Sequence, residues 1–313
     1  MTPEARDDLQ RSHYNARVIH IRRVHDDLMT LRVAPDAKRR PTLAGQYTLV
    51  GLGCWEDRID GLRSGTRNSS AAEALIRRAY SISCPILDDN GALTRIDDLP
   101  FLEFYVNCIR KPADDPPMLT PRLFALHEGD RLYVGPHSHG RYTVETIGRS
   151  ENVILAATGT GEAPHNAMVA ELLKRGHIGR IAVVTCVRYR ADLGYIAVHR
   201  ALERRFVNYR YVPLTTREPE NADPSHPDYV GKSYLQDLFA SECVAQRIGF
   251  PLDPSRTHVY LCGAPAMIGL PRSTPEGDIH FPEPTGMVEV LVHLGFHLDE
   301  PHNPGNIHYE KYW

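Results

Sequence analysis

A short turn between an apolar run and a helical stretch carries the residues best suited to bind a phosphate group. The segment 157–164 reads Ala-Thr-Gly-Thr-Gly-Glu-Ala-Pro. Gly159 and Gly161 allow a tight turn and a close approach of the backbone to a ligand, and Pro164 suits the first turn of a helix. The free N–H groups of that helix would then face a diphosphate. The turn has neither the Gly-Lys-Ser/Thr of a P-loop nor the third glycine of the usual dinucleotide fingerprint, so a plain tight turn in an α/β fold fits it equally well.

A second segment, Arg78-Ala79-Tyr80-Ser81, brings together side chains that suit a flat, phosphorylated ligand. On a strand, Arg78 and Tyr80 share one face, and Ala79 and Ser81 share the other. An arginine can pair bidentately with a diphosphate, a tyrosine ring can stack on a heterocycle, and a serine hydroxyl can donate to a ring nitrogen. Taken alone, however, such a tetrapeptide is more often a strand with a surface arginine.

The elements that position these two segments differ between the halves of the chain. The first half reads as short alternating strands separated by turn residues, at 18–21, 28–33, 47–50, 102–108 and 131–134, which is typical of an antiparallel barrel or sandwich. In the second half, apolar strands alternate with helices. The strands are expected at 153–157, 181–187, 209–214 and 258–262, and the helices at 165–175, 196–206, 234–247 and 287–291. This alternation predicts a parallel, doubly wound sheet.

We expect the boundary between the halves near Ser150, which gives domains at 1–150 and 151–313. The stretches 51–70 and 269–286 are rich in turn residues and are expected to be loops.

Composition excludes several classes of protein. The chain has 313 residues, 42% of them hydrophobic, and a net charge of -3, which fits a globular protein and gives no field that would favour nucleic acid. No apolar run is long enough for a membrane span, and the polar start predicts no signal peptide. The six scattered cysteines indicate reduced thiols and therefore the cytoplasm. The closest histidine pairs, at 137/139 and 293/297, lack a zinc-binding pattern, so no metal is expected.

The order of the motifs resembles the ferredoxin–NADP reductase family, in its bacterial flavodoxin/ferredoxin branch. Arg78 to Ser81 precedes the turn at 157–164, which is followed by Leu261-Cys262-Gly263-Ala264-Pro265 and by an aromatic ending. The resemblance runs from Tyr14 to Trp313. It implies an antiparallel FAD-binding β-barrel over 1–150, followed by a Rossmann-like NADP-binding domain over 151–313 whose C-terminal tail returns to the flavin.

The resemblance also implies roles for residues toward FAD. Arg78 would hold the diphosphate, Tyr80 would stack on the isoalloxazine ring, and Ser81 would hydrogen-bond near flavin N5. The other implied FAD contacts are Ala79, Tyr105, Met118, Leu119, Thr120, Thr160, Tyr309, Tyr312 and Trp313. The loop Met118–Thr120 would bind the FAD phosphates through its backbone and hydroxyl.

Toward NADP(H), the resemblance implies a second set of contacts, formed by Gly159, Gly161, Val187, Arg188, Thr216, Arg217 and Lys232. Arg188 would reach the phosphates, and Thr216 with Arg217 would grip the 2′-phosphate. Lys232 stands where the family often has an arginine, so it keeps the charge but not the fork geometry. Cationic groups suit a dianionic phosphate, which favours NADPH over NADH.

Three residues are candidates for work at the reacting atoms. Besides Ser81, the resemblance places the Cys262 thiol beside the nicotinamide, and Glu310 is a candidate proton relay to the reduced flavin. A buried core cysteine and a salt-bridged surface carboxylate are the ordinary alternatives. Three aromatic residues among the last seven favour a tail that is docked on the cofactor over a frayed end.

The implied function is hydride transfer between NADPH and FAD, and transfer of single electrons between FAD and ferredoxin or flavodoxin, by a monomer without a membrane or nucleic-acid partner. Two alternatives remain open. One is an NADH-dependent reductase component of an oxygenase, and the other is a non-catalytic subunit that binds a flavin or a nucleotide.

Overall fold

The computed structural model describes residues 2–59, 73–108, 118–273 and 279–312. The chain divides into two compact units, Met1–Thr143 and Val144–Trp313, here called the barrel unit and the α/β unit. The change of unit therefore falls a few residues before Ser150.

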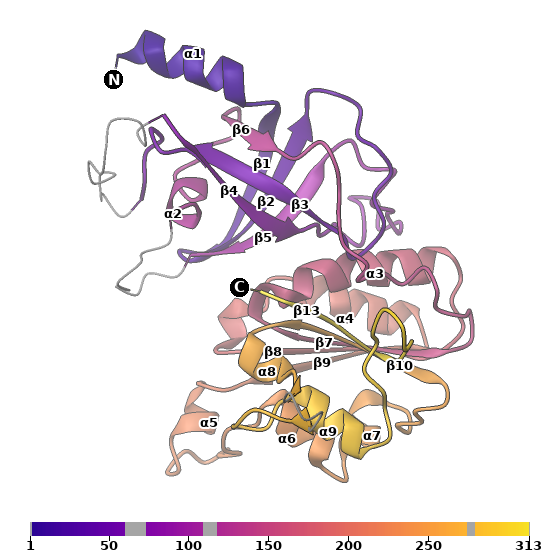
Figure 1. The fold of residues 1–313 in the computed structure, drawn as a ribbon. Coiled ribbons are helices and arrows are strands. Elements are labelled where there is room, and N and C mark those ends of the chain that lie inside the picture. Colours follow the sequence, from indigo (N-terminus) through magenta and orange to yellow (C-terminus); the bar gives the residue numbers. More distant parts are fainter. Residues whose placement is uncertain (1, 60–72, 109–117, 274–278, 313) are drawn as a thin grey trace. The chain divides into compact units, whose positions relative to one another are not determined.

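The barrel unit is built on one antiparallel sheet (Figure 1). Its strands are β1 (Ala16–His25), β2 (Leu28–Pro35), β3 (Tyr47–Gly53), β4 (Leu75–Ser81), β5 (Leu102–Asn107) and β6 (Arg131–Val134). They pair in the order β4-β3-β6-β1-β2-β5. Beyond β4, the Ser83 N–H donates to the Glu103 carbonyl on β5 at 2.8 Å, so the two ends of the sheet approach each other. This architecture confirms the predicted antiparallel, barrel-like first half.

Pairing register and burial agree in this sheet. Leu31 of β2 lies opposite Phe104 of β5, and Val33 lies opposite Leu102. All four side chains are buried, so the same apolar residues that define the strands also fill the core.

Two helices accompany the sheet in the described part of this unit, α1 (Pro3–His13) and α2 (Thr120–Leu123). Helix α1 was not predicted, although its start signals are present in the sequence. Thr2 caps the helix by accepting the Ala5 N–H at 3.3 Å, Pro3 occupies the first turn and Glu4 follows. No residue of α1 is buried, so the helix is held by something other than an apolar stripe.

The α/β unit holds a parallel sheet with the strand order β13-β10-β7-β8-β9, which confirms the predicted wound sheet. The strands are β7 (Asn152–Thr158), β8 (Ile181–Val187), β9 (Tyr209–Thr215), β10 (Thr257–Gly263) and β13 (Ile307–Lys311). The helices are α3 (Glu162–Lys174), α4 (Ile196–Arg205), α5 (Pro219–Ala222), α6 (Leu235–Ala240), α7 (Val244–Ile248), α8 (Pro265–Ile268) and α9 (Met287–His293). Within this unit α3 and α4 lie on one side of the sheet, and α6 to α9 lie on the other (Figure 1).

The core explains why β7 and β8 read as continuous apolar runs. Ile154, Ala156 and Val184 are fully buried, and they belong to a cluster that continues into α6 through Phe239 and into α9 through Leu291. A strand covered on both faces needs apolar residues at every position.

Two segments of this unit differ from the expectations. The single helix expected over 234–247 is interrupted, because Ser241 is extended and its hydroxyl donates to the Leu238 carbonyl at 2.7 Å. The expected loop at 269–286 contains a small ribbon of β11 (Arg272–Ser273) and β12 (Ile279–His280). The expected loop at 51–70 lies partly outside the described residues. No described helix is long and apolar enough to cross a membrane.

Candidate functional site

The glycine-rich turn of the α/β unit forms a close contact with the end of β10. After β7 ends, residues Gly159–Gly161 make one 3₁₀ turn, and α3 begins at Glu162. Gly159 has a φ of +54°, and a Cβ on residue 161 would lie 2.3 Å from the Cys262 carbonyl oxygen. Both glycines are therefore needed, the first for its backbone angle and the second for space.

Gly263 completes this contact from the other side. Its φ is +131°, and a Cβ there would lie 2.2 Å from the hydroxyl oxygen of Thr158. The same hydroxyl accepts the Ala264 N–H at 2.9 Å. The turn and the Cys262–Gly263 segment, about 100 residues apart in sequence, thus meet at the carboxyl edge of the sheet, where wound sheets bind their ligands.

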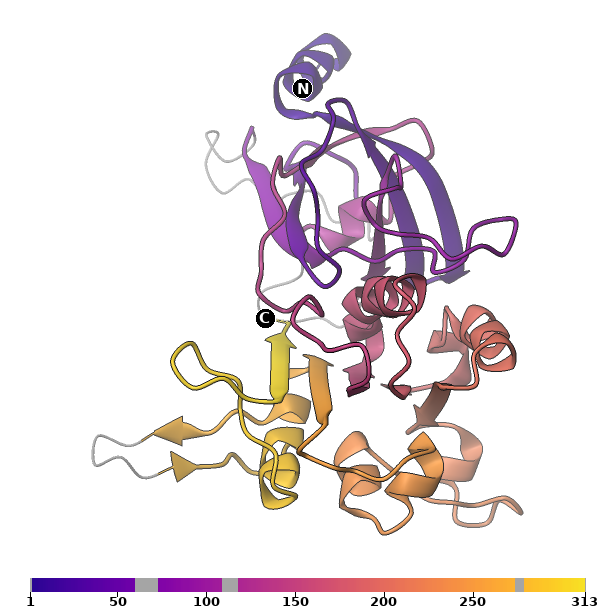
Figure 2. The ribbon, with the colours of Figure 1, turned by 90° about the vertical axis from the view of Figure 1, so that its right-hand side faces the viewer.

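The C-terminal segment forms strand β13, which pairs in parallel with β10 (Figure 2) and therefore ends at the same carboxyl edge of the sheet. Glu310 lies opposite Cys262 in the register. Beyond the strand, the Tyr312 N–H donates to the Gly263 carbonyl at 3.0 Å, and its hydroxyl donates to the Thr160 carbonyl at 3.2 Å. Trp313 lies outside the described residues, whereas Tyr309 is 36% exposed.

The chemistry open to Cys262 follows from its surroundings. The side chain is fully buried, and burial together with the nearby Glu310 charge raises the pKa of its thiol well above the ordinary value, opposed by a hydrogen bond with Tyr312. At neutral pH the group is therefore a thiol. It can position a neighbouring ring, but it is not a nucleophile.

The predicted phosphate-gripping residues lie together at the ends of β8 and β9. Val187 pairs with Thr215, and the Arg217 N–H donates to the Arg188 carbonyl at 2.9 Å. The Thr216 side chain is buried, and its hydroxyl donates to the Val187 carbonyl at 3.2 Å. Because the single hydroxyl proton is engaged there, side-chain recognition at this edge depends on the basic residues.

One of those basic residues lies close to a carboxylate, and the other two do not. The Arg188 guanidinium lies 3.6 Å from an Asp192 oxygen. In contrast, Arg217 and Lys232 are exposed and form no ion pair with any residue in the described ranges. A dianion at this edge would find their charges available.

In the barrel unit, the tetrapeptide at 78–81 forms the end of β4. Arg78 and Ala79 are exposed, Tyr80 is half-buried and Ser81 is buried, so burial increases along the tetrapeptide toward the end of the strand. The Tyr80 ring meets Phe104 edge-on, with centroids 6.2 Å apart, and burial raises the pKa of its hydroxyl. Tyr105, the next residue along β5, is buried.

The loop Met118–Thr120 of the same unit is fixed by a buried arginine. The Arg122 side chain donates to the Met118 carbonyl at 2.6 Å and to the Cys54 carbonyl at 2.9 Å. The buried Thr120 hydroxyl oxygen has no hydrogen-bond partner among the described residues. An unsatisfied buried hydroxyl costs about 1–3 kcal/mol, so a bound anion would remove a penalty here.

Comparisons with known proteins agree with this arrangement. A family model described as the oxidoreductase NAD-binding domain matches residues 155–272. Over 230 residues the chain is 28% identical to the flavodoxin/ferredoxin–NADP reductase of Escherichia coli. This alignment covers 73% of this chain and 76% of the relative. It is 26% identical over 267 residues to the ferredoxin–NADP reductase of Pseudomonas aeruginosa, covering 82% and 86% of the two chains.

The chain is related to the flavodoxin/ferredoxin–NADP reductases. The resemblance found in the sequence is thereby confirmed. A solved ferredoxin–NADP⁺ reductase from Neisseria gonorrhoeae with bound FAD and NADP shares the fold with a TM-score of 0.69 at 18% identity, and the match covers 96% of this chain and 98% of that chain.

One buried cluster of this chain was not predicted from the sequence. Glu162, the first residue of α3, is fully buried, and its Oε1 accepts hydrogen bonds from the Thr185 and Tyr211 hydroxyls at 3.1 and 3.0 Å. The same oxygen lies 3.1 Å from Nε2 of His199, which is also fully buried. Since Glu162 belongs to the Gly-Thr-Gly-Glu turn, this cluster anchors the start of α3. The only sequence signal was a carboxylate in the first turn of a helix.

No group of three or more metal-ligating side chains is found in the ranges the structure describes.

Proposed function

We propose that this chain is an FAD-dependent reductase that transfers hydride between NADPH and FAD and passes single electrons between FAD and a ferredoxin or flavodoxin. The observation that carries the proposal is the carboxyl edge of the α/β unit. There the glycine turn, Cys262 and the aromatic C-terminal segment interlock, in a chain related to reductases of that name.

The residues of the barrel unit fit FAD. The orphaned Thr120 hydroxyl and the Met118–Leu119 backbone would hold its phosphates, together with the exposed Arg78. Tyr80, Ser81 and Tyr105 would contact its ring system. When bound, FAD supplies the capacity to accept a hydride and to release electrons singly. The protein's part is to bind, orient and shield it.

The α/β unit fits NADP(H). The space left by Gly159 and Gly161 would let a diphosphate approach the N–H groups at the start of α3. Arg217 and Lys232, which form no ion pair with a described residue, would offer their charges to the 2′-phosphate. Val187, Arg188 and Thr216 shape the edge between β8 and β9. These features support NADPH as the preferred donor.

At the reacting atoms we assign positioning to Cys262 and proton handling to Glu310. The neutral, buried thiol orients a ring without reacting with it. Glu310, half-buried beside it on β13, can hold or release a proton. Thr160, Tyr309, Tyr312 and Trp313 would line the flavin from this unit, and the hydroxyl of Tyr312 already ties the tail to Thr160.

The setting of the enzyme is part of the same proposal. All six cysteines lie among the described residues, and each is a free thiol, which supports the reducing cytoplasm as the compartment. We propose that it works there as a monomer.

The decisive experiment is an anaerobic titration of the purified protein with NADPH and, separately, with NADH, following the flavin absorbance. The proposal expects complete bleaching with NADPH and much weaker bleaching with NADH. A protein that takes up no FAD refutes it. Preferential reduction by NADH would favour the oxygenase component, and a yellow protein that neither nucleotide bleaches would favour a non-catalytic subunit.

A further inference from the structure

Helix α1 is attached to the barrel unit through polar contacts, and these contacts converge on one segment. We infer that α1 is a clamp that positions the FAD phosphate loop, acting through residues 53–59 and the buried Arg122. The inference rests on the proposed function, because the assignment of FAD to the loop Met118–Thr120 belongs to it. None of the clamp residues themselves would touch the cofactor.

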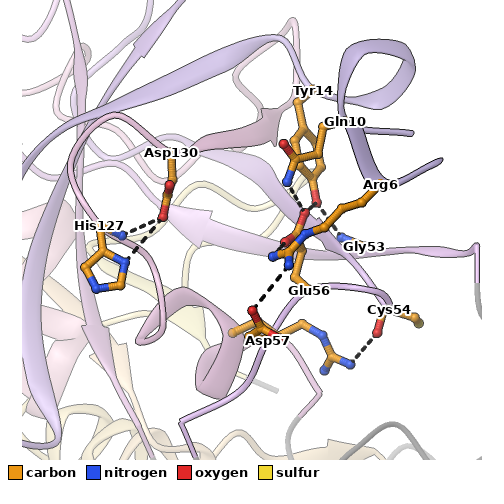
Figure 3. A network of polar contacts seen from close by, with 10 residues as sticks. Arg6, Gln10, Tyr14, Gly53, Cys54, Glu56, Asp57, His127 and Asp130 are labelled. Carbon is orange, nitrogen blue, oxygen red and sulfur yellow. Dashed lines mark hydrogen bonds and ion pairs between the residues drawn. The ribbon is translucent and has the colours of Figure 1, made fainter. Parts of the chain in front are cut away.

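The contacts converge on the carboxylate of Glu56 (Figure 3). Its Oε2 accepts a hydrogen bond from Arg6 at 2.6 Å, and its Oε1 accepts one from Gln10 at 2.9 Å and one from the Tyr14 hydroxyl at 2.8 Å. The Glu56 side chain is only 8% exposed. A carboxylate buried to that degree needs such donors, so α1 and Glu56 hold each other in place.

Tyr14 extends the clamp to the end of β3. Its hydroxyl donates to Glu56 and also accepts the Gly53 N–H at 2.9 Å. The Trp55 ring lies against the same junction, with its centroid 6.1 Å from that of Tyr14 and 5.7 Å from that of His13. The segment 53–56 is therefore held through the Gly53 amide and through the side chains of Trp55 and Glu56.

Arg122 connects the segment 53–56 to the loop Met118–Thr120, to which we assign the FAD phosphates. One of its terminal nitrogens donates to the Cys54 carbonyl, and the other donates to the Met118 carbonyl. The Ile59 N–H donates to the Pro121 carbonyl at 3.2 Å. A displacement of residues 54–59 would therefore move the loop whose Thr120 hydroxyl lacks a partner among the described residues.

Helix α1 contributes no residue to the core of the barrel unit. Helix α1 buries none of its residues, so its loss exposes no apolar side chain of α1, and the strands pair without it. Its contribution should therefore be local order in segments 53–59 and 118–122.

The test compares three variants of the full chain with the wild type. One lacks residues 2–13, one carries Arg6→Ala with Gln10→Ala, and the control carries Asp8→Ala with Arg11→Ala. In the control, an exposed pair on the same helix is removed, with side chains 78% and 77% exposed. FAD affinity is measured by quenching of flavin fluorescence on the apoprotein, and hydrogen–deuterium exchange is followed in peptides covering 53–59 and 118–122.

We expect the first two variants to raise the Kd for FAD about tenfold or more and to speed exchange in both segments. The control should stay within about twofold of the wild type, as is usual for exposed pairs. Unchanged exchange in the two segments after removal of α1 would overturn the clamp. If the wild type takes up no FAD, the proposed function fails, and the exchange measurement alone then decides whether the clamp exists.

Discussion

Gly161 and Cys262 pack so closely that a Cβ on residue 161 would lie 2.3 Å from the Cys262 carbonyl oxygen. The contact joins the start of the first helix of the α/β unit to the end of β10, at the turn to which we assign the NADP diphosphate. Several expected outcomes follow from this edge of the sheet.

Substitution of Gly161 by alanine should disturb the edge directly. The added methyl group meets backbone atoms, which cannot rotate away, so we expect a loss of about 1–3 kcal/mol in the free energy of unfolding. We also expect at least a tenfold rise in the Kd for NADP⁺, measured by calorimetry. Gly249→Ala is the control, because Gly249 has a φ of +89° but open space around it. Equal NADP⁺ affinity in the two variants would contradict the assignment.

Arg217→Ala should separate NADPH from NADH. Removing one charged donor to a phosphate costs about 1.5–3 kcal/mol, so the KM for NADPH should rise about tenfold or more, while the KM for NADH should change less than about twofold. Steady-state kinetics with both nucleotides measure this. Arg204→Ala, an exposed arginine at the end of α4, serves as the matched control. If Arg217→Ala raises the KM for NADPH and the KM for NADH to a similar extent, the assignment of the 2′-phosphate to this site is wrong.

Shortening the C-terminus should change the flavin environment. Because β13 extends to Lys311, a variant that ends at Lys311 loses Tyr312 and Trp313 but keeps the strand. We expect altered FAD affinity, or weaker discrimination between NADPH and NADH, because the bonds from Tyr312 to Thr160 and Gly263 are lost. Tyr312→Phe, which removes only the hydroxyl, should show a smaller effect. An enzyme with unaltered FAD Kd and nucleotide preference would mean that the tail does not act on the cofactor.

His165 should make the protein sensitive to acid. Burial, with a smaller effect of nearby His199, lowers the pKa of His165 from 6.5 to about 3. Below pH 6.5 the unfolded chain takes up a proton that the folded chain excludes, so stability falls as the pH drops from about 6.5 toward 3. The slope is at most about 1.4 kcal/mol per pH unit.

Urea unfolding between pH 7 and pH 4.5 measures this dependence. The His165→Gln variant should show a shallower loss than the wild type, whereas the exposed His302→Gln variant should match the wild type. If the free energy of unfolding of His165→Gln falls with pH as steeply as that of the wild type, the acid sensitivity arises from other groups.

The fold was largely predictable because its strongest signals are local. The strands β7 and β8 are continuous apolar runs, and the turn between β7 and α3 carries its own glycines. The interruption at Ser241 was not predictable in this way, since apolar periodicity continues across it, whereas the structure shows an extended Ser241 whose hydroxyl donates to the Leu238 carbonyl. Helix α1 lacked a buried face, so only its cap could have revealed it.

The candidate site was predictable only where it is made of motifs. The strand β13 reads Ile-His-Tyr-Glu-Lys, a mixed segment that becomes a strand because β10 offers it an edge. The partners of Glu162 lie 23, 37 and 49 residues away in sequence, and no local pattern marks them. Likewise, the buried Arg122 links Cys54 to Met118, a bridge that exists only after the barrel has formed.

One oxygen atom of Glu162 is shared by Thr185, His199 and Tyr211. This sharing constrains which amino-acid substitutions the four positions can accept. Three neighbours that depend on a single acceptor do not lose free energy independently when they are replaced. A substitution at one of them alters what the other two contribute, so these positions should vary as a set among proteins that keep the carboxylate, and their individual deletions should sum to more or less than the joint deletion.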